Sequence, residues 1–350
     1  MAGKTVGILT GGGDCPGLNA VIRASVRKGI TSHGYRFRGI LKGWRGMMDC
    51  EWEPLGLEEI SGILPKGGTI LGTSRTNPFK EHDGGEIVID NMRRMKLDAL
   101  IAIGGEDTLG VANKLATLGV SVVGVPKTID NDLNNTDYTF GFDTAVNIVT
   151  EAIDRIHTTA ESHNRVMVIE VMGRHSGWIA LHAGLAGGAD MILIPEQKYR
   201  VDEIVETIRQ RHERGKDFSI VVVAEGVHLI SEESNDEEYV VSEGGLDEFG
   251  HVKLGGIGQL VAANIEKATG FETRVTVLGH LQRGGTPTAF DRVLGTRFGI
   301  AAVDLVHQDN YGHMVSLQGN EIVPVALADA VDQLKVVDQD FYDIAKVFFG

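Results

Sequence analysis

The sequence has few cysteines and lacks any long apolar run. Only Cys15 and Cys50 occur in 350 residues, which argues against a disulfide framework and is typical of a reducing compartment. No stretch of about 18 apolar residues is present, so we do not expect a membrane-spanning helix. The N-terminal residues run into a glycine loop without a signal-type cleavage region. We therefore expect a cytoplasmic protein.

Positive charge is also scarce. Lysine and arginine total 33 against 48 aspartates and glutamates, which gives a formal net charge of −15. A charge of this sign opposes nonspecific binding to nucleic acid or to anionic membranes. An acidic protein that binds phosphate groups must gather its few cations locally, so the positions of the arginines are informative. The hydrophobic content of 42% is that of a globular protein, and the length suits two domains.

Short apolar runs alternate with helix-like stretches, and glycine or proline separates them. The predicted strands are 4–10, 99–103, 120–125, 165–171, 191–194 and 219–224, and the predicted helices include 18–33 and 109–118. This repeated order indicates parallel sheets covered by helices on both faces. Ligands of such sheets bind beyond the carboxyl ends of the strands. We interpret the acidic segment 231–250 as an exposed loop, which is favoured over a cation site.

A glycine loop, Thr10–Gly17, follows the first predicted strand. Consecutive glycines let backbone N–H groups approach an anion, and the following helix adds positive potential. A tight turn that needs glycine conformations is the alternative. The loop is neither a Walker A motif nor a dinucleotide fingerprint, because Leu18-Asn19 replaces the lysine and hydroxyl pair and Pro16 replaces the third glycine.

A second loop, Gly104–Thr108, again follows a strand and carries Glu106 and Asp107. Adjacent carboxylates beside glycines suit a Mg²⁺ ion that is shared with substrate phosphates. Acidic residues that begin a helix are also ordinary caps, so each carboxylate alone leaves both interpretations open.

A third loop, Pro126–Asp132, places a cation, a hydroxyl and two carboxylates within a few residues. That spacing predicts an anion-holding group beside a base that accepts a hydroxyl proton. A turn rich in Asx residues is the weaker interpretation, because two comparable loops occur elsewhere.

Cationic side chains are expected near the ends of other strands. They are Arg75, Arg165, Arg174, Arg274, His280 and Arg283. Arginine binds phosphate in a two-pronged manner, which suits a doubly phosphorylated product. Any one of them alone would be read as a surface ion pair.

These motifs together resemble the phosphofructokinase family along nearly the whole chain. The matching segments are GGGDCPG at 11–17, LGTSR at 71–75, GGEDT at 104–108, PKTIDND at 126–132, VMGRHSG at 171–177 and LGHLQRGG at 278–285. The resemblance implies an α/β fold of two three-layer α/β/α domains with mostly parallel sheets and an active site in the cleft between them. It also implies direct, Mg²⁺-dependent phosphoryl transfer to the 1-hydroxyl of fructose 6-phosphate, in which positioning and charge neutralisation dominate catalysis.

The resemblance carries roles onto individual residues. Asp130 matches the general base beside the sugar hydroxyl, and Glu106 matches the Mg²⁺-linked position. We expect Arg174, Lys127 and Mg²⁺ to neutralise charge on the moving phosphoryl group. The positions assigned to the phosphoryl donor are Gly12, Gly13, Arg75 and Thr108. The positions assigned to the sugar phosphate are Thr128, Asp132, Arg165, Met172, Gly173, Glu225, Arg274, His280 and Arg283.

Asp107 and Lys127 favour pyrophosphate as the donor, because ATP-using relatives usually carry glycine at both positions. In the pyrophosphate-dependent branch that this chain resembles, the aspartate fills the space of the α-phosphate of ATP. Two unit charges about 4 Å apart repel by roughly 4 kcal/mol at an effective dielectric near 20, which weakens binding about a thousandfold. Lys80 stands where ATP-using bacterial relatives often have an arginine that contacts the nucleotide, and this difference also favours pyrophosphate as the donor. Glu106 stands where many relatives have aspartate, so the metal position is expected to differ slightly.

Three other functions remain as alternatives. They are an ATP-dependent phosphofructokinase, a catalytically silent sugar-phosphate sensor and a nicotinamide-dependent oxidoreductase. The sensor is disfavoured by Asp130, since a mere binder needs no base, and the oxidoreductase by the missing glycine fingerprint. Arg23 and Arg27 resemble a basic pair at an effector site of bacterial ATP enzymes, and we interpret them as exposed helix charges.

The resemblance also predicts the organisation of the chain. The larger, phosphoryl-donor domain would comprise 1–141 and 282–332, and the smaller, sugar-phosphate domain 142–281 and 333–350. Sites in this family borrow arginines from a neighbouring subunit, so a homo-oligomer, dimer or tetramer, is expected. Arg165 and Arg274 are the expected contributors.

Overall fold

The computed structural model describes residues 3–230, 237–238, 241–246 and 252–350. The chain forms two compact units. Unit 1 comprises Met1–Ile129, Leu133–Thr144 and Arg283–Leu334. Unit 2 comprises Asp130–Asp132, Ala145–Gln282 and Lys335–Gly350. No helix within the described ranges combines the length and the apolarity that crossing a membrane requires.

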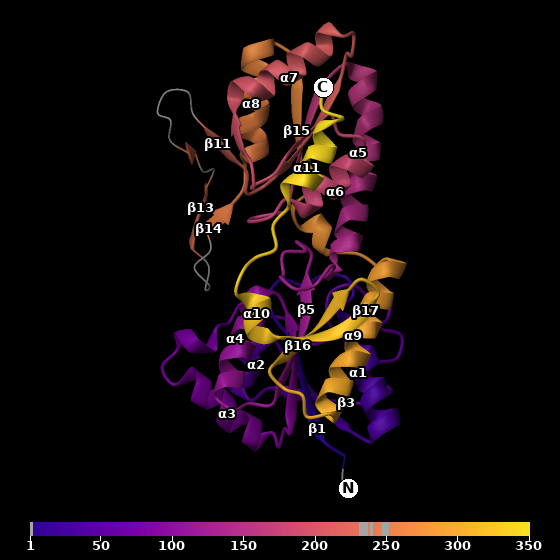
Figure 1. Cartoon of the computed structure of the whole chain (residues 1–350), viewed down its shortest axis with the longest axis vertical. Coiled ribbons are helices and arrows are strands. Elements are labelled where there is room, and N and C mark those ends of the chain that lie inside the picture. Colours follow the sequence, from indigo (N-terminus) through magenta and orange to yellow (C-terminus); the bar gives the residue numbers. More distant parts are fainter. Residues whose placement is uncertain (1–2, 231–236, 239–240, 247–251) are drawn as a thin grey trace. The chain divides into compact units, whose positions relative to one another are not determined.

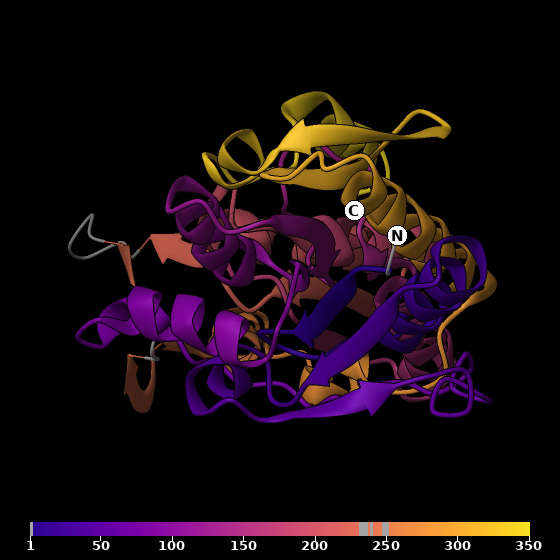
Figure 2. The same ribbon diagram turned by 90° about the horizontal axis from the view of Figure 1, so that it is seen from below.

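Unit 1 is built on an eight-stranded sheet (Figure 1). Its strands are β1 (Thr5–Thr10), β2 (Arg36–Ile40), β3 (Trp52–Leu55), β4 (Ala99–Gly104), β5 (Val122–Thr128), β6 (Phe140–Gly141), β16 (His313–Gln318) and β17 (Glu321–Ala326). The strand order is β17-β16-β5-β4-β1-β2-β3, with β6 paired to the end of β5. The five inner strands are parallel, and β17 and β3 are antiparallel at the two edges. Figure 2 shows the yellow-orange β16–β17 hairpin and the purple β3 at these opposite edges.

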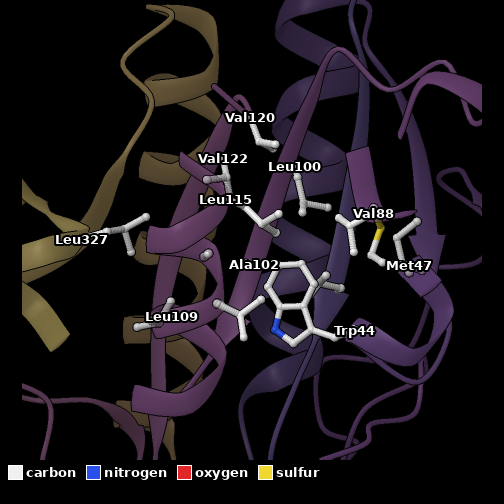
Figure 3. Close-up of a cluster of buried hydrophobic side chains, with 14 of the residues drawn as sticks. Trp44, Met47, Val88, Leu100, Ala102, Leu109, Leu115, Val120, Val122 and Leu327 are labelled. Carbon is white, nitrogen blue, oxygen red and sulfur yellow. The ribbon is translucent and has the colours of Figure 1, made fainter. Parts of the chain in front are cut away.

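Helices cover both faces of this sheet. They are α1 (Leu18–His33), α2 (Trp44–Asp49), α3 (Gly84–Arg94), α4 (Glu106–Thr117), α9 (Ala289–His307) and α10 (Leu327–Val331), with a short 3₁₀ helix, η1 (Pro78–Lys80). On one face α1 and α9 pack together, and Phe37 of β2 lies under α1 at Gly29. On the other face, α2, α3, α4 and α10 enclose the core cluster of Figure 3, in which Trp44 and Leu115 lie over Leu100 and Ala102 of β4. The unit is therefore the predicted three-layer arrangement.

Unit 2 holds a smaller, fully parallel sheet of order β15-β7-β10-β8. Its strands are β7 (Val166–Val171), β8 (Met191–Leu193), β10 (Ser219–Ala224) and β15 (Thr273–Val277). Its helices are α6 (Trp178–Ala186), α7 (Val201–Glu213), α8 (Ile257–Thr269) and α11 (Gln339–Lys346), with η2 (Gly279–Arg283) after β15. The long helix α5 (Phe142–His163) begins in unit 1 and continues in unit 2. Two small additions, β9 (Lys198–Arg200) with β11 (His228–Ile230) and β12 (Glu237–Glu238), and β13 (Val241–Leu246) with β14 (Val252–Leu254), complete the unit.

Two predictions about elements need correction. The third predicted loop was to begin at Pro126, but β5 continues through Thr128, because Lys127 and Thr128 pair with β6. The acidic segment 231–250 is not wholly a loop, since 237–238 pairs with β11 and 241–246 pairs with β14. The rest of that segment lies outside the described residues.

Candidate active site

The glycine loop that follows β1 is fastened by backbone and hydroxyl hydrogen bonds. Gly11 N–H donates to the Ile103 carbonyl of β4 (2.9 Å), and Gly12 N–H donates to the Ser74 carbonyl (3.1 Å). The Thr73 hydroxyl donates to the Gly12 carbonyl (2.5 Å). The loop is therefore held against the carboxyl end of β4 and the 73–75 segment, where Arg75 is exposed.

Lys127 brings a buried cation to this loop. It lies at the carboxyl end of β5 with only 3% of its surface exposed, and its ammonium donates to the Gly13 carbonyl. A Cβ added to Gly12 would lie 3.6 Å from Lys127 Nζ and 3.7 Å from Thr108 Oγ1. A fixed ammonium beside a glycine loop creates positive potential where an anion can approach the backbone closely.

Arg283 adds a second cation on the same loop. Its Nη1 donates to the Asp14 carbonyl (3.4 Å), and a Cβ added to Gly13 would lie 2.1 Å from that nitrogen. Only glycine leaves room for the guanidinium there. The sequence assigned Arg283 to the sugar phosphate, and the structure places it in unit 1 beside the predicted donor loop.

The second predicted loop begins α4. Gly105 is the residue before the helix, and Glu106 and Asp107 lie half-buried in its first turn, where negative charge is stabilised by the helix dipole. Thr108 is buried and packs under Gly11 and Gly104. Two carboxylates at one end of a helix are the oxygen donors that Mg²⁺ uses together with substrate phosphates. We refer to Gly12, Gly13, Thr108, Lys127 and Arg283 as the unit 1 cluster.

Cys15 lies inside the glycine loop, but its thiol does not suit a role as a nucleophile. Its side chain is fully buried, and its thiol donates to the Phe140 carbonyl (3.6 Å). Burial raises the pKa of the Cys15 thiol to about 12, although the Lys127 ammonium opposes the shift. The thiol therefore stays protonated at neutral pH and packs as a small apolar group.

Unit 2 gathers another set of predicted residues beyond β7 and β10. Met172 N–H donates to Gln282 Oε1 (3.2 Å), and Gly226 N–H donates to the Gly173 carbonyl (3.0 Å). Gly173 has φ of 138°, a backbone conformation that suits glycine. These bonds shape the turn that carries Arg174, while Glu225 N–H donates to the β7 carbonyl of Val171 (2.8 Å).

The predicted base lies in a short segment, Asp130–Asp132, that belongs to unit 2. The Ser176 hydroxyl donates to the Asp130 carbonyl (3.2 Å), and Lys335 N–H donates to the Asp132 carbonyl (2.8 Å). Asn131 between them has φ of 52°, a left-handed conformation that asparagine tolerates. The segment is thus fixed from two sides. Thr128, just before it, accepts a bond from the Thr139 hydroxyl at its carbonyl (2.7 Å).

Arg165 and Arg274 are not brought to the other predicted residues of unit 2. Both lie at the amino ends of the paired strands β7 and β15, and both contact Glu272, with Arg165 at 2.8 Å. The Arg165 guanidinium lowers the pKa of that carboxyl. Met172 and Arg174 follow the carboxyl end of β7, and His280 follows that of β15, where it is exposed in η2. A six-residue strand separates the two ends by about 20 Å.

Three supporting residues were not singled out by the sequence. They are Thr73, Ser176 and Gln282, and each lies within a motif, LGTSR, VMGRHSG or LGHLQRGG. Gln282 is fully buried and also donates to the Gly279 carbonyl (3.0 Å). Their position inside the motifs could have suggested a role for them. Their contacts could not be predicted in the same way, because Gly12, Asp130 and Met172, to which they bond, are remote in sequence.

A family model described as Phosphofructokinase matches residues 5–306. The chain belongs to the phosphofructokinase family. It is 59% identical over 346 residues to a pyrophosphate–fructose 6-phosphate 1-phosphotransferase of Streptomyces coelicolor, with 99% of each chain covered. A protein of the same name from Amycolatopsis methanolica is 59% identical over 345 residues, again with 99% of each covered. An ATP-dependent 6-phosphofructokinase of Mycobacterium bovis is 51% identical over 346 residues, with 99% of each covered.

Solved phosphofructokinase structures share the fold. The crystal structure of Pichia pastoris phosphofructokinase in the T-state superposes with a TM-score of 0.83 at 31% identity. This chain is covered to 99% there and spans 36% of the Pichia chain. A pyrophosphate-dependent phosphofructokinase from Nitrosospira multiformis gives a TM-score of 0.84 at 21% identity, covering 99% of this chain and 91% of that one, which is a likeness of fold.

Proposed function

We propose that this phosphofructokinase transfers a phosphoryl group from pyrophosphate to the 1-hydroxyl of fructose 6-phosphate, giving fructose 1,6-bisphosphate and phosphate. The observation that carries the choice of donor is the buried Lys127 ammonium on the glycine loop. A compact polyanionic donor gains from a point charge at that position, and the backbone N–H groups of the loop add to it. The names of the relatives at 59% identity support the same reading.

Asp107 complements Lys127 by disfavouring a nucleotide. Its carboxylate lies in the first turn of α4, the turn that also carries Thr108 of the unit 1 cluster. An α-phosphate bound against this carboxylate would meet a like charge, and the repulsion costs most when both groups are partly desolvated. Pyrophosphate has no α-phosphate and avoids the cost.

In this proposal the residues assigned to the donor lie in unit 1. Those assigned to the sugar phosphate lie in unit 2, except Thr128 and Arg283, which lie in unit 1. Asp130 accepts the proton of the 1-hydroxyl, and the bonds from Ser176 and Lys335 keep its segment in place. Arg174 neutralises charge on the moving phosphoryl group, and Lys127 does so from the donor side. The remaining sugar-binding assignments are Thr128, Asp132, Met172, Gly173, Glu225, His280 and Arg283, and Arg75 is assigned to the donor.

We infer that Mg²⁺ is required. Glu106 and Asp107 supply carboxylate oxygens in one helical turn, and Mg²⁺ is commonly bound through one or two carboxylates plus substrate phosphates. The ion would neutralise phosphate charge in the transition state. Glu106 is the residue assigned to it.

We also propose that the active form is a homo-oligomer in which Arg165 and Arg274 serve the sugar site of a neighbouring subunit. Their position at the amino ends of β7 and β15, about 20 Å of strand away from Met172, supports this assignment. The free thiols of Cys15 and Cys50 agree with a cytoplasmic location.

The test is an assay of the purified protein with fructose 6-phosphate and Mg²⁺, with pyrophosphate and ATP compared at equal concentrations. We expect turnover with pyrophosphate and little with ATP. A preference for ATP would overturn the donor assignment and leave the sugar site intact. Turnover with neither donor, in protein that binds fructose 6-phosphate, would favour a sensor.

An ATP-dependent phosphofructokinase is the second candidate function. It is supported by relatives at 51% identity that are named ATP-dependent, over nearly the whole chain. The two candidates share the sugar site and the base, and they differ only at the donor. The Asp107 and Lys127 variants described in the Discussion separate them.

A further inference from the structure

A groove of about 730 Å³ opens in unit 1 beside the edge strand β3 and its neighbour β2, away from the residues assigned above. It lies where β2 begins and β3 ends, and its lining includes Tyr35, Arg36, Arg38, Trp52, Glu59 and Lys96. Figure 1 labels β3, the strand that carries Trp52, Pro54 and Leu55 of this lining. The volume is that of a site for a small organic ligand.

The groove concentrates cations in a chain that has few of them. Three of its residues, Arg36, Arg38 and Lys96, are cationic, and Glu59 is its one carboxylate. Within the part of the chain that the structure describes, no carboxylate forms an ion pair with any of the three cations. In a protein of net charge −15, three cations in one groove without an ion-pair partner among the described residues are an unusual concentration of positive charge.

Arg38 is held in position by an aromatic platform. Its guanidinium carbon lies 3.8 Å from the ring centroid of Trp52, which is on the adjacent strand β3. Stacking leaves the N–H groups at the rim of the guanidinium available to an anion and reduces the conformational entropy that binding would cost. Arg36 lies two residues earlier on β2 and therefore on the same face of the sheet.

Glu59 does not neutralise this face. Its Oε2 accepts a hydrogen bond from Gly56 N–H at 2.7 Å, within the turn that follows β3. The carboxylate charge is therefore partly compensated by a backbone dipole. The formal charges of the lining still sum to a surplus of positive charge.

We propose that this groove binds a small anion that carries two or more phosphate groups. Arginine pairs in two-pronged fashion with phosphate oxygens, and Lys96 contributes a third cation at the same mouth. A small ligand fits better than an acidic macromolecule, because the rest of this acidic chain would repel an extended polyanion. The site shares no residue with the unit 1 cluster, and Arg23 and Arg27 of α1 do not line it.

The test uses ¹⁹F NMR of protein labelled with 5-fluorotryptophan, because the chain has three tryptophans and only Trp52 lines the groove. Tripolyphosphate and ATP are titrated at constant ionic strength without sugar phosphate, and a Trp52→Phe variant assigns the resonance. We expect the Trp52 resonance to shift and saturate while that of the buried Trp44 stays in place. Equal dissociation constants for tripolyphosphate and ATP would show that the groove recognises only the phosphate groups. Tighter binding of ATP would show that it also contacts the nucleoside.

Two variants and two controls decide the result. Arg36→Ala and Lys96→Ala leave the Trp52 ring and its arginine in place, and each should weaken binding at least about tenfold. Arg93→Ala removes an exposed arginine of α3 that is paired with Asp90, and it should change nothing. Lys127→Met should retain the Trp52 response, which separates this site from the donor site. A Trp52 resonance that does not move, or that moves equally in Arg36→Ala, would overturn the proposal.

Discussion

Lys127 shows how one side chain acquires a role from its surroundings. It is a strand residue whose ammonium is buried and donates to the carbonyl of Gly13, more than a hundred positions earlier in the chain. The PKTIDND motif identified the residue, and the family resemblance suggested a donor contact. The hydrogen bond to the Gly13 carbonyl could not be predicted from the sequence, because this contact depends on how β1 and β5 are placed in one sheet.

Replacing Lys127 with methionine tests its contribution to the donor. The length of the side chain is kept, but the cation on the glycine loop is lost. We expect kcat/KM for pyrophosphate to fall by about 10² or more, as when one charged donor to a phosphoryl transition state is removed. Steady-state kinetics measure this, with Lys267→Met, at an exposed position of α8, as the matched control. A drop of less than threefold would contradict the role.

Asp107→Gly tests selectivity against ATP. Removal of the carboxylate relieves a repulsion of up to about 4 kcal/mol at an effective dielectric near 20, and solvent screening of the half-exposed group reduces this. We therefore expect the ratio of kcat/KM for ATP to that for pyrophosphate to rise at least about tenfold.

The control is Asp14→Gly, which removes a carboxylate from the glycine loop but not from the first turn of α4. Unchanged discrimination in Asp107→Gly would assign selectivity to other residues.

At the scale of elements, helix α1 illustrates what local chemistry determines. The predicted helix 18–33 has the observed bounds, because Gly17 precedes it and Gly34 ends it in the left-handed conformation with bonds to the carbonyls of Gly29 and Ile30. Strand β5 illustrates the opposite case. Its extension through Thr128 depends on pairing with β6, which no local pattern encodes.

The core cluster on the α4 face of unit 1 should be sensitive to loss of Trp44, which is 1% exposed. Trp44→Ala removes a large buried side chain, and such changes cost about 3–5 kcal/mol in the free energy of unfolding. Urea denaturation followed by circular dichroism measures the loss. Trp52→Ala, at the surface, is the control and should cost clearly less. Equal losses in the two variants would mean that the cluster does not dominate the stability of unit 1.

The first turns of α5 and α9 share a buried carboxyl that should make stability depend on pH. Asp291 Oδ2 accepts bonds from Thr144 N–H (2.8 Å) and the Thr144 hydroxyl (2.5 Å). Burial raises the pKa of Asp291 from 3.8 to about 6. The unfolded chain therefore releases this proton first as the pH rises, so the contribution of Asp291 to stability falls between about pH 4 and 6.

Asp291→Asn should remove that dependence while keeping an acceptor for Thr144. Relative to the parent protein, the variant should gain on the order of 1 kcal/mol of unfolding free energy on going from pH 5 to pH 7.5. Urea titrations at both pH values measure this difference. A difference that does not change with pH would show that Asp291 titrates normally.

At the scale of the whole molecule, the family and the parallel α/β architecture followed from strand–loop–helix repetition and from motif order. The exact set of residues in each of the two units did not follow from these patterns. Residues 130–132 join unit 2 while the residues on either side join unit 1, and this depends on contacts such as that between Lys335 and Asp132. The antiparallel return of β17 at the sheet edge was likewise absent from the sequence patterns.

Subunit complementation tests the proposed role of Arg165. Asp130→Asn and Arg165→Ala should each be nearly inactive, for lack of the base and of the borrowed arginine. If each site takes its base from one chain and its arginine from another, mixed oligomers regain intact sites. In a two-fold dimer, random mixing should restore about a quarter of the parent activity.

Each variant refolded alone is the control for the mixing procedure and should stay inactive. Glu272→Gln is a second control, which tests whether loss of the ion pair between Arg165 and Glu272 alone inactivates the protein. Mixed oligomers that form but stay inactive would mean that each site takes Asp130 and Arg165 from the same chain.

The strand order of unit 1 has a consequence for how the protein is made. β5 ends at Thr128, and its parallel neighbour β16 begins at His313, 313 − 128 = 185 residues later. At about 5–20 residues per second, the ribosome needs roughly 10–40 s to deliver that neighbour. During this interval one edge of β5 has no β16 to pair with, and an open strand edge invites association with other nascent chains. Chaperone dependence during synthesis, and its relief when β16–β17 is moved by circular permutation to precede β1, would follow from the order of the strands alone.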